Sequence, residues 1–279
     1  MEILICKRAG FCFGVKRAID IAFDLARNRD GGVYSFGPLI HNPQVIEELR
    51  SKGIAPIDDI HSPGIKTLIV RTHGISPSVY DEISGMDYEL VDATCPFVKK
   101  AQQHAQTLKE EGYKILILGD KKHPEVQALL GFAGDNVITV SGSDPIPALK
   151  GKVGIIVQTT QPVETLKKRV CGILDTAKEV KVYNTICDST SLMLDETKKL
   201  AGAVDLMIVV GGKNSANTTQ LTVLAKGICD KVYHIETSDE LIEEWFKDVK
   251  KAGITGGAST PRWIIDDVAE KLRKISGKT

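Results

Sequence analysis

Short apolar runs alternate with amphipathic helical stretches along the whole chain, and this alternation constrains the fold more than any other feature. We expect strands at EILIC, GVYSF, KTLIVR, YELVDA, KILIL, NVITV, VGIIVQ, VKVYNT, LMIVV, KVYHI and AGIT. Helical patterns follow most of these strands, for example at 15–27, 97–111, 164–178 and 192–201. Such alternation predicts an α/β fold with parallel sheets and right-handed crossovers. Continuous apolar runs such as MIVV are typical of strands covered on both faces.

Three of the six cysteines recur at similar intervals. Cys12, Cys95 and Cys187 are separated by 83 and 92 residues, and a helical pattern follows each of them. This recurrence predicts three similar parallel-sheet α/β modules. The expected modules are 14–95, 96–187 and 188–279, joined by the N-terminal strand 1–13. A helix N-terminus lowers the pKa of a cysteine and favours the metal-binding thiolate, so three such modules around an axis would bring three thiolates together.

Three thiolate ligands leave one coordination position open, as in catalytic metal centres. Zinc and an iron–sulfur cluster both suit soft thiolate ligands, and three unrelated buried thiols are the alternative. The chain has no Cys-x-x-Cys pair, which argues against a zinc finger or ribbon. We expect Cys6, Cys171 and Cys229 to be structural, because free cysteines are usually buried.

Polar side chains gather at the carboxyl ends of the expected strands, where open parallel α/β folds bind ligands. The candidates are His41, His73, His123, Thr159, Thr160, Ser215, Asn217 and Ser259. Imidazoles and hydroxyl groups at one edge suit an anionic ligand. Plain helix capping is the alternative for Ser215 and Ser259, because capping and anion binding use the same geometry. The stretch GGKNS lacks P-loop spacing, which excludes nucleoside triphosphate binding.

Glu125, in the motif His-Pro-Glu, lies two residues into an expected helix. An acidic residue in a first turn commonly only complements the helix dipole. In a pocket, the same carboxyl group would donate protons, with Thr159 as a relay. We expect the other three histidines to be structural or on the surface; they are His61, His104 and His234.

The overall charge excludes several classes of partner. The chain has 36 basic and 36 acidic residues, so it lacks the basic excess of a general nucleic-acid or anionic-membrane binder. No apolar run is long enough to span a bilayer, and the N-terminal MEILICKRAG lacks the apolar stretch of a signal peptide. We therefore expect a cytoplasmic protein.

Nine motifs together resemble one family. In chain order they are GFCFGVKRAI, GPLIHNPQV, VRTHG, DATCPFVKK, HPEV, VQTTQ, NTIC, GGKNSANT and GASTP. They are similar to those of the LytB family, the 4-hydroxy-3-methylbut-2-enyl diphosphate reductases, from Cys12 to the last helix. The resemblance implies a pseudo-threefold trefoil of three α/β modules around a central [4Fe–4S] cluster. It implies Cys12, Cys95 and Cys187 as the cluster ligands, with the substrate hydroxyl oxygen on the fourth iron.

The resemblance also implies the reaction. It is a two-electron, two-proton reductive dehydroxylation giving isopentenyl and dimethylallyl diphosphates, the last step of the methylerythritol phosphate (non-mevalonate) isoprenoid pathway. A reduced ferredoxin or flavodoxin-type carrier supplies the electrons. We expect neither nucleic acid nor a membrane as a partner of the protein. Glu125 matches the acid that delivers protons, and Thr159 the hydroxyl that holds the substrate alcohol, with Thr160 adjacent. The residues that match the diphosphate pocket are His41, His73, His123, Ser215, Asn217 and Ser259.

Two positions depart from the family pattern. Ala216 replaces the second serine of a Ser-Ser-Asn run, and Cys187-Asp188-Ser189-Thr190 replaces Cys-x-Ala-Thr. Neither change removes a ligand or the acid, and Asp188 adds negative charge near the thiolate. The alternative function is an iron–sulfur redox sensor that binds a phosphorylated effector, but a sensor needs no proton relay such as Glu125 with Thr159. A zinc hydrolase is a weaker alternative, because no histidine-rich metal set accompanies a general base.

Overall fold

Parallel strand pairing organises the computed structural model, which describes residues 1–141 and 144–277. In these residues every paired strand runs parallel to its neighbours, in three four-stranded sheets. The strands are β1 (Glu2–Ile5), β2 (Val33–Phe36), β3 (Ala55–Ile57), β4 (Thr67–Val70), β5 (Glu89–Asp92), β6 (Lys114–Leu118), β7 (Val137–Val140), β8 (Lys152–Val157), β9 (Glu179–Val182), β10 (Leu206–Val210), β11 (Lys231–Ile235) and β12 (Lys251–Gly256). The predicted α/β class with parallel sheets is confirmed.

Helices connect these strands as crossovers. They are α1 (Phe13–Asn28), α2 (Pro43–Ser51), α3 (Pro77–Ile83), α4 (Pro96–Glu110), α5 (Pro124–Ala133), α6 (Val163–Leu174), α7 (Asp188–Ala201), α8 (Ala216–Lys226) and α9 (Arg262–Ser276), with short 3-10 segments η1 (Ser238–Glu240) and η2 (Glu243–Phe246). Within the described ranges, no helix has both the length and the apolar composition needed to cross a membrane.

The chain divides into two compact units. Unit 1 contains Met1–Lys16, Ile40–Glu48 and the chain from Asp188 onward, and unit 2 contains Arg17–Leu39 and Leu49–Cys187. Sheet A, with the order β1-β12-β10-β11, lies in unit 1. Sheet B, with the order β5-β4-β2-β3, and sheet C, with the order β9-β8-β6-β7, lie in unit 2. The three sheets share one topology, and the N-terminal β1 takes in sheet A the place that β5 and β9 take in the others.

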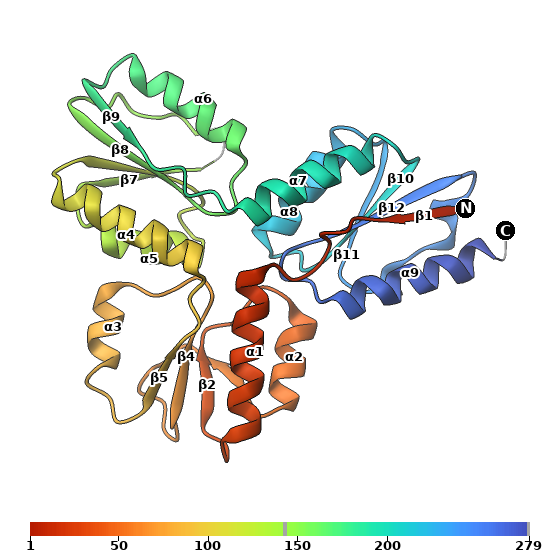
Figure 1. Ribbon diagram of the computed structural model, residues 1–279, viewed down its shortest axis with the longest axis horizontal. Helices are drawn as coiled ribbons and strands as arrows, with labels where there is room; N and C mark the ends of the chain where they lie inside the picture. Colours follow the sequence, from red (N-terminus) through yellow and green to blue (C-terminus); the bar gives the residue numbers. More distant parts are fainter. Residues whose placement is uncertain (142–143, 278–279) are drawn as a thin grey trace. The chain divides into compact units, whose positions relative to one another are not determined.

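Alternate residues of the central strand β10 pack into separate hydrophobic cores on the two faces of sheet A. In β10, Leu206, Ile208 and Val210 pack with apolar residues of α9, whereas Met207 and Val209 pack with α7 and α8. Figure 1 shows the same layering in unit 1, with α9 along one face of sheet A and α7 and α8 along the other. Burial of both faces explains why this strand is a continuous apolar run.

The structure differs in several places from the expected local structure, and the helix expected at 192–201 begins earlier, at Asp188. The helix predicted over 164–178 ends at Leu174, because the chain must turn before β9, where the N–H groups of Lys178 and Glu179 both donate to the Gly151 carbonyl. The short strand β3 was not predicted, because it has three residues and contains Pro56. Proline lacks the N–H of a central strand, and β3 lies at the edge of sheet B, where proline is tolerated.

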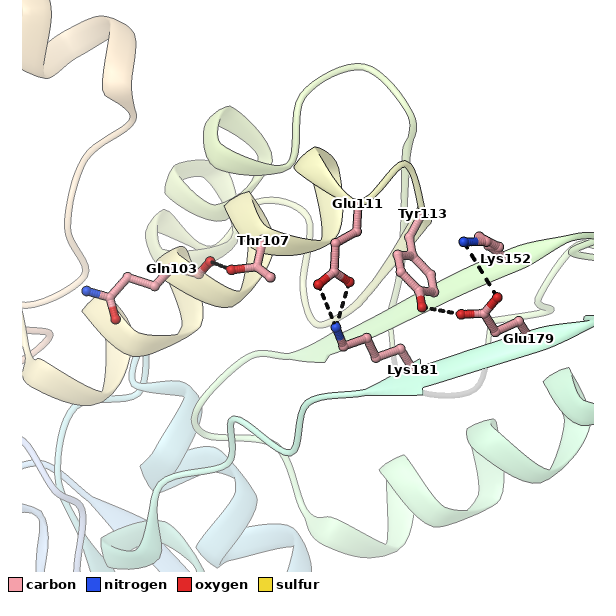
Figure 2. A network of polar contacts seen from close by, with 7 residues as sticks. All are labelled: Gln103, Thr107, Glu111, Tyr113, Lys152, Glu179 and Lys181. Atoms are coloured by element: carbon pink, nitrogen blue, oxygen red, sulfur yellow. Dashed lines mark hydrogen bonds and ion pairs between the residues drawn. The ribbon is translucent and has the colours of Figure 1, made fainter.

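Polar contacts tie the edge strand β9 to the rest of its unit (Figure 2). The Lys181 ammonium group lies 2.6 and 2.9 Å from the two carboxylate oxygens of Glu111, just after α4. The Tyr113 hydroxyl donates to Glu179, which also pairs with Lys152 at 3.7 Å. Exposed ion pairs of this kind contribute little to stability, because water screens their charges. Together these contacts link the end of α4 and the residues just after it to β9. The helix α4 begins directly after Cys95, and the chain continues from β9 to Cys187.

Two glycine substitutions should change stability in opposite directions. A Cβ at Gly154, in β8, would lie 2.6 Å from the Leu108 side chain of α4, so Gly154→Ala overpacks this face and should cost about 1–3 kcal/mol. A Cβ at the exposed helical Gly172 meets nothing within 4 Å, so Gly172→Ala should stabilise α6 by up to about 1 kcal/mol. Urea unfolding of both variants measures the difference, and a destabilised Gly172→Ala would contradict this assignment of α6.

Candidate functional site

Each of the three periodic cysteines lies between an edge strand and a helix. Cys12 follows β1 and directly precedes α1, Cys95 follows β5 and directly precedes α4, and Cys187 follows β9 and directly precedes α7. The predicted helix after each cysteine is therefore confirmed. All three side chains are half-buried, as expected for side chains with room for a ligand. Each of these side chains lies at the positive end of a helix dipole.

One hydrogen bond recurs at all three cysteines. The backbone N–H of Cys12 donates to Ala258 at 3.1 Å, that of Cys95 to Thr72 at 3.0 Å, and that of Cys187 to Thr159 at 2.9 Å. Each acceptor carbonyl lies two residues beyond the end of the neighbouring strand, which is β12, β4 or β8. Each of the three cysteines is therefore held against the neighbouring loop by the same backbone hydrogen bond.

The other cysteines have different environments. Cys6 and Cys229 are buried, as predicted, and burial raises the pKa of Cys6 to about 11. Cys171 is exposed on α6, so the prediction that it is a buried structural residue is wrong. The helical pattern placed Cys171 on a helix but did not distinguish the covered face from the open one.

Glu125 is the most deeply buried candidate residue of unit 2. It lies in the first turn of α5, with 2% of its surface exposed. One carboxylate oxygen accepts from the Thr159 backbone N–H at 2.7 Å, and the other accepts from the Thr159 hydroxyl at 2.8 Å. Burial raises the pKa of Glu125 from 4.5 to about 7, although the two Thr159 hydrogen bonds oppose the rise. The carboxyl group can therefore hold or release a proton near neutral pH.

His123 caps the helix that carries Glu125. Its ring nitrogen Nδ1 accepts from the Glu125 backbone N–H at 3.2 Å, so the neutral ring carries its proton on Nε2. The ring packs edge-on against His73 with 5.2 Å between the ring centroids. Unit 2 thus brings two of the predicted histidines together next to the acid.

Gln158, to which sequence analysis assigned no role, orients Thr160. Its side-chain oxygen accepts from the Asp120 N–H at 3.0 Å, and this bond fixes the orientation of the amide. Its Nε2 then donates to the Thr160 Oγ1 at 3.1 Å, which leaves the Thr160 hydroxyl proton to another acceptor. The only sequence signal for this role was a glutamine directly before two threonines at the end of an expected strand.

A second group of candidate residues lies in unit 1. The Ser259 hydroxyl is 3.2 Å from the His41 carbonyl oxygen and 3.4 Å from the Ser215 hydroxyl. A Cβ at Gly212 would lie 2.7 Å from the same His41 carbonyl, so only glycine permits this approach. Ser215 also caps α8 by accepting from the Thr218 N–H at 3.4 Å, so the capping alternative holds for this serine.

Asn217 presents a buried donor beside these serines. Its Oδ1 accepts from the Ala258 N–H at 2.8 Å, which fixes the orientation of the amide. Its Nδ2 is buried and has no hydrogen-bond partner in the described part of the chain. An unpaired buried donor is costly in a folded protein, so this one points to an acceptor on a ligand.

Glu125 and Asn217 occupy equivalent places in their sheets. Each lies seven residues beyond the end of its strand, β6 or β10, in the first turn of the following helix. Each accepts from the N–H two residues beyond the neighbouring strand, that of Thr159 or Ala258. The same position therefore provides a proton-binding acid in unit 2 and a neutral donor in unit 1.

The candidate residues are divided between the two units. Unit 1 contains Cys12, His41, Ser215, Asn217 and Ser259. Unit 2 contains His73, Cys95, His123, Glu125, Thr159, Thr160 and Cys187. The remaining histidines have local roles, since His234 Nε2 lies 2.8 Å from the Gly211 carbonyl oxygen and His104 stacks on Tyr183. His61 is exposed beside Glu82, as expected for a surface residue.

Comparison with known proteins gives one consistent result. The model of the LytB protein family matches residues 3–273. The chain is 45% identical over 278 residues to the 4-hydroxy-3-methylbut-2-enyl diphosphate reductase of Citrifermentans bemidjiense, covering 99% of this chain and 98% of the relative. It is 45% identical over 281 residues to the enzyme of the same name from Geobacter sulfurreducens, covering 100% and 99%.

Two solved structures are also similar. One is a 4-hydroxy-3-methyl-but-2-enyl diphosphate reductase described as the terminal enzyme of the non-mevalonate pathway, with a TM-score of 0.73, 42% identity, and coverage of 98% of this chain and 100% of that one. The other is the E-1-hydroxy-2-methyl-but-2-enyl-4-diphosphate reductase from Plasmodium falciparum, with a TM-score of 0.89 and 26% identity, and the match covers 97% of this chain and 87% of that one.

The protonation of Glu125 can be measured directly. We expect infrared difference spectra to show a protonated carboxyl band that is lost with a midpoint near pH 7 and is absent from Glu125→Gln. Thr159→Val should raise the midpoint further, because it removes a hydrogen bond that stabilises the carboxylate. A midpoint near the ordinary glutamate value of about 4.3 would contradict the assignment.

The same shift should appear in stability. Because the folded chain binds this proton more tightly than the unfolded chain, the wild type loses stability as the pH rises from 4.5 to about 7. Relative to Glu125→Gln, which does not titrate, the free energy of unfolding should fall by up to about 3 kcal/mol over this range. Urea unfolding at several pH values, with the exposed Glu164→Gln as the control, measures the difference.

Proposed function

Because the chain belongs to the LytB protein family, we propose that it catalyses the reductive dehydroxylation of 4-hydroxy-3-methylbut-2-enyl diphosphate. The products are isopentenyl and dimethylallyl diphosphates, and the reaction is the terminal step of the non-mevalonate pathway. The substrate alcohol takes up two electrons and two protons, and its carbon–oxygen bond breaks to release water. A reduced ferredoxin or flavodoxin-type carrier supplies the electrons.

An iron–sulfur cluster is the cofactor of this reaction, and we assign Cys12, Cys95 and Cys187 as its ligands. The donor set fits, because three half-buried thiols, each at a helix N-terminus and each held by the same backbone hydrogen bond, suit iron–sulfur ligation. Three ligands fit a [4Fe–4S] cluster with one iron open to the substrate. When bound, the cluster supplies a Lewis acid for the hydroxyl oxygen and a source of electrons.

The contacts of Thr159 carry this proposal. Its carbonyl accepts from the Cys187 N–H, and its own N–H and hydroxyl both donate to the Glu125 carboxylate. One residue thus connects a buried acid with a pKa of about 7 to a cluster ligand. An acid so placed protonates a departing hydroxyl group, and the resulting carboxylate is stabilised by the two Thr159 donors. A redox sensor has no use for such a donor, so the sensor alternative is not favoured.

The remaining polar groups bind the diphosphate in this proposal. Asn217 Nδ2 is a buried donor without a protein partner, and it lies in the first turn of α8, where the helix dipole favours anions. Unit 1 also contains three other residues that we assign to substrate binding: His41, Ser215 and Ser259. Unit 2 contains three more: His73, His123 and Thr160. Ala216 offers no hydroxyl group, so its contribution is limited to the backbone N–H at the start of α8.

Substitution of the acid tests the catalytic assignment. Glu125→Gln keeps an acceptor for the Thr159 N–H but cannot donate a carboxyl proton, so turnover should fall by about 10²–10⁴-fold while iron and sulfide contents stay unchanged. The assay uses the diphosphate alcohol and a strong chemical reductant under anaerobic conditions. Glu164→Gln, at an exposed first-turn glutamate of α6, is the matched control. Full turnover in Glu125→Gln, or a protein that binds zinc without sulfide, would contradict the proposal.

Substitution of Asn217 tests the diphosphate assignment. Asn217→Asp retains an oxygen for the Ala258 N–H, so the turn should persist, but it replaces the Nδ2 donor by a negative charge. We expect KM for the diphosphate alcohol to rise by at least about 100-fold, in line with the loss of a charge-assisted hydrogen bond and added repulsion. Asn28→Asp, at the exposed end of α1, is the control. An unchanged KM would remove Asn217 from the binding site.

A further inference from the structure

The turns that carry Cys95 and Cys187 are closed by a side chain three residues before the cysteine. Asp92 Oδ1 accepts from the Thr94 N–H at 2.8 Å, and Asn184 Oδ1 accepts from the Ile186 N–H at 3.3 Å. In both turns the donor belongs to the residue directly before the cysteine. The equivalent residue before Cys12 is Ala9, whose side chain accepts no hydrogen bond.

The turn before Cys12 is instead held by another element. The two carboxylate oxygens of Glu196, in α7, accept from the backbone N–H groups of Lys7 and Arg8 at 2.7 and 2.9 Å. The next residue of α7, Thr197, is fully buried, and its hydroxyl lies 2.8 Å from that of Thr255 in β12. Because α7 is thus fixed on sheet A, Glu196 connects the turn to a rigid support.

We propose that Glu196 is a positioning residue for Cys12, which anchors the turn 6–12 and so sets where the Cys12 thiolate meets the cluster. The inference rests on the proposed function in one respect, the assignment of Cys12 as a cluster ligand. Glu196 binds backbone and not side chains, so it constrains the path of the chain. The two bonds are charge-assisted, which makes them stronger than neutral hydrogen bonds.

The other contacts of the turn do not replace this anchor. The Cys6 N–H donates to the Ile254 carbonyl at the start of the turn, and the Cys12 N–H donates to the Ala258 carbonyl at its end. Between them, Ala9 donates only to Cys6 within the turn itself, at 3.2 Å. Lys7 and Arg8 are exposed, so water can satisfy their N–H groups when the carboxylate is removed. Loss of Glu196 should therefore loosen the turn without unfolding unit 1.

Limited proteolysis of the full chain measures how firmly Glu196 holds the turn, and it does not need the cluster. Trypsin cleaves after Lys7 and after Arg8, and the Arg8 N–H that Glu196 binds belongs to the peptide bond after Lys7. We expect Glu196→Ala to speed cleavage at these two bonds by at least about tenfold, as the loss of a charge-assisted hydrogen bond predicts. Glu196→Gln retains one acceptor oxygen and should be intermediate. Asp195→Ala, at the exposed neighbouring position of α7, should match the wild type.

The reconstituted protein tests the consequence for Cys12. In Glu196→Ala the cluster should lose iron to a chelator at least several-fold faster than in Asp195→Ala, and the electron paramagnetic resonance spectrum of its reduced form should change, with partial recovery in Glu196→Gln. Equal cleavage in Glu196→Ala and the wild type would overturn the anchor. Faster cleavage with an unchanged cluster would overturn its role toward Cys12. A wild type that binds no cluster would instead refute the proposed function, and the proteolysis result would stand separately.

Discussion

Parallel pairing of the strands is the constraint on which the rest of this structure depends. Parallel strands end at the same edge of a sheet, so the loops that follow β1 and β12, β4 and β5, or β8 and β9 lie next to each other. The recurring bond from a cysteine N–H to the carbonyl of the neighbouring loop uses this adjacency. A slip in register would move the acceptor away from the cysteine, so each turn depends on the pairing of its own sheet.

The same framework carries different chemistry in its two units. Glu125 and Asn217 hold equivalent backbone N–H groups at similar distances, but one is a buried acid and the other a buried amide. The residues before the two helices also differ in type, but His123 and Ser215 both cap their helices with side-chain acceptors. Repetition of the turn preserves geometry, and a change of side chain at the fixed position replaces a titratable acid by a neutral donor.

Burial raises the pKa of Glu125, and the hydrogen bonds of Thr159 limit the rise. Without burial, a carboxyl group is ionised at neutral pH and cannot supply a proton. Without the two donors of Thr159, burial would raise its pKa further and keep the proton bound. The balance near 7 suits an acid that must both release and regain its proton. The Thr159 carbonyl also accepts from the Cys187 N–H, so the residue that tunes the acid is bonded directly to a proposed cluster ligand.

Much of this arrangement could be predicted from the sequence, because its signals are local. Continuous apolar runs separated by helical periodicity predicted the parallel α/β class, and the strand ends identified the loops with Cys12, Cys95 and Cys187. The exposed face of α6 around Cys171 and the short edge strand with Pro56 were not predicted. Both depend on which neighbours cover an element, and a local pattern does not contain that information.

The sequence by itself determined the residue types and their order: a cysteine before each of three helices, and an acid or an amide in the first turn after a buried strand. Only the tertiary structure decided what those residues do. Burial raises the pKa of Glu125 to about 7, and the hydrogen bonds of Thr159, which is 34 residues away, oppose the rise. The donor role of Asn217 depends on the Ala258 N–H, and the anchoring of Lys7 and Arg8 on Glu196, nearly 190 residues along the chain. The contacts of Thr159 and Ala258 form only when the sheets pair, because pairing brings strand ends that are distant in sequence to one edge. The Glu196 contacts form only when α7 packs on sheet A.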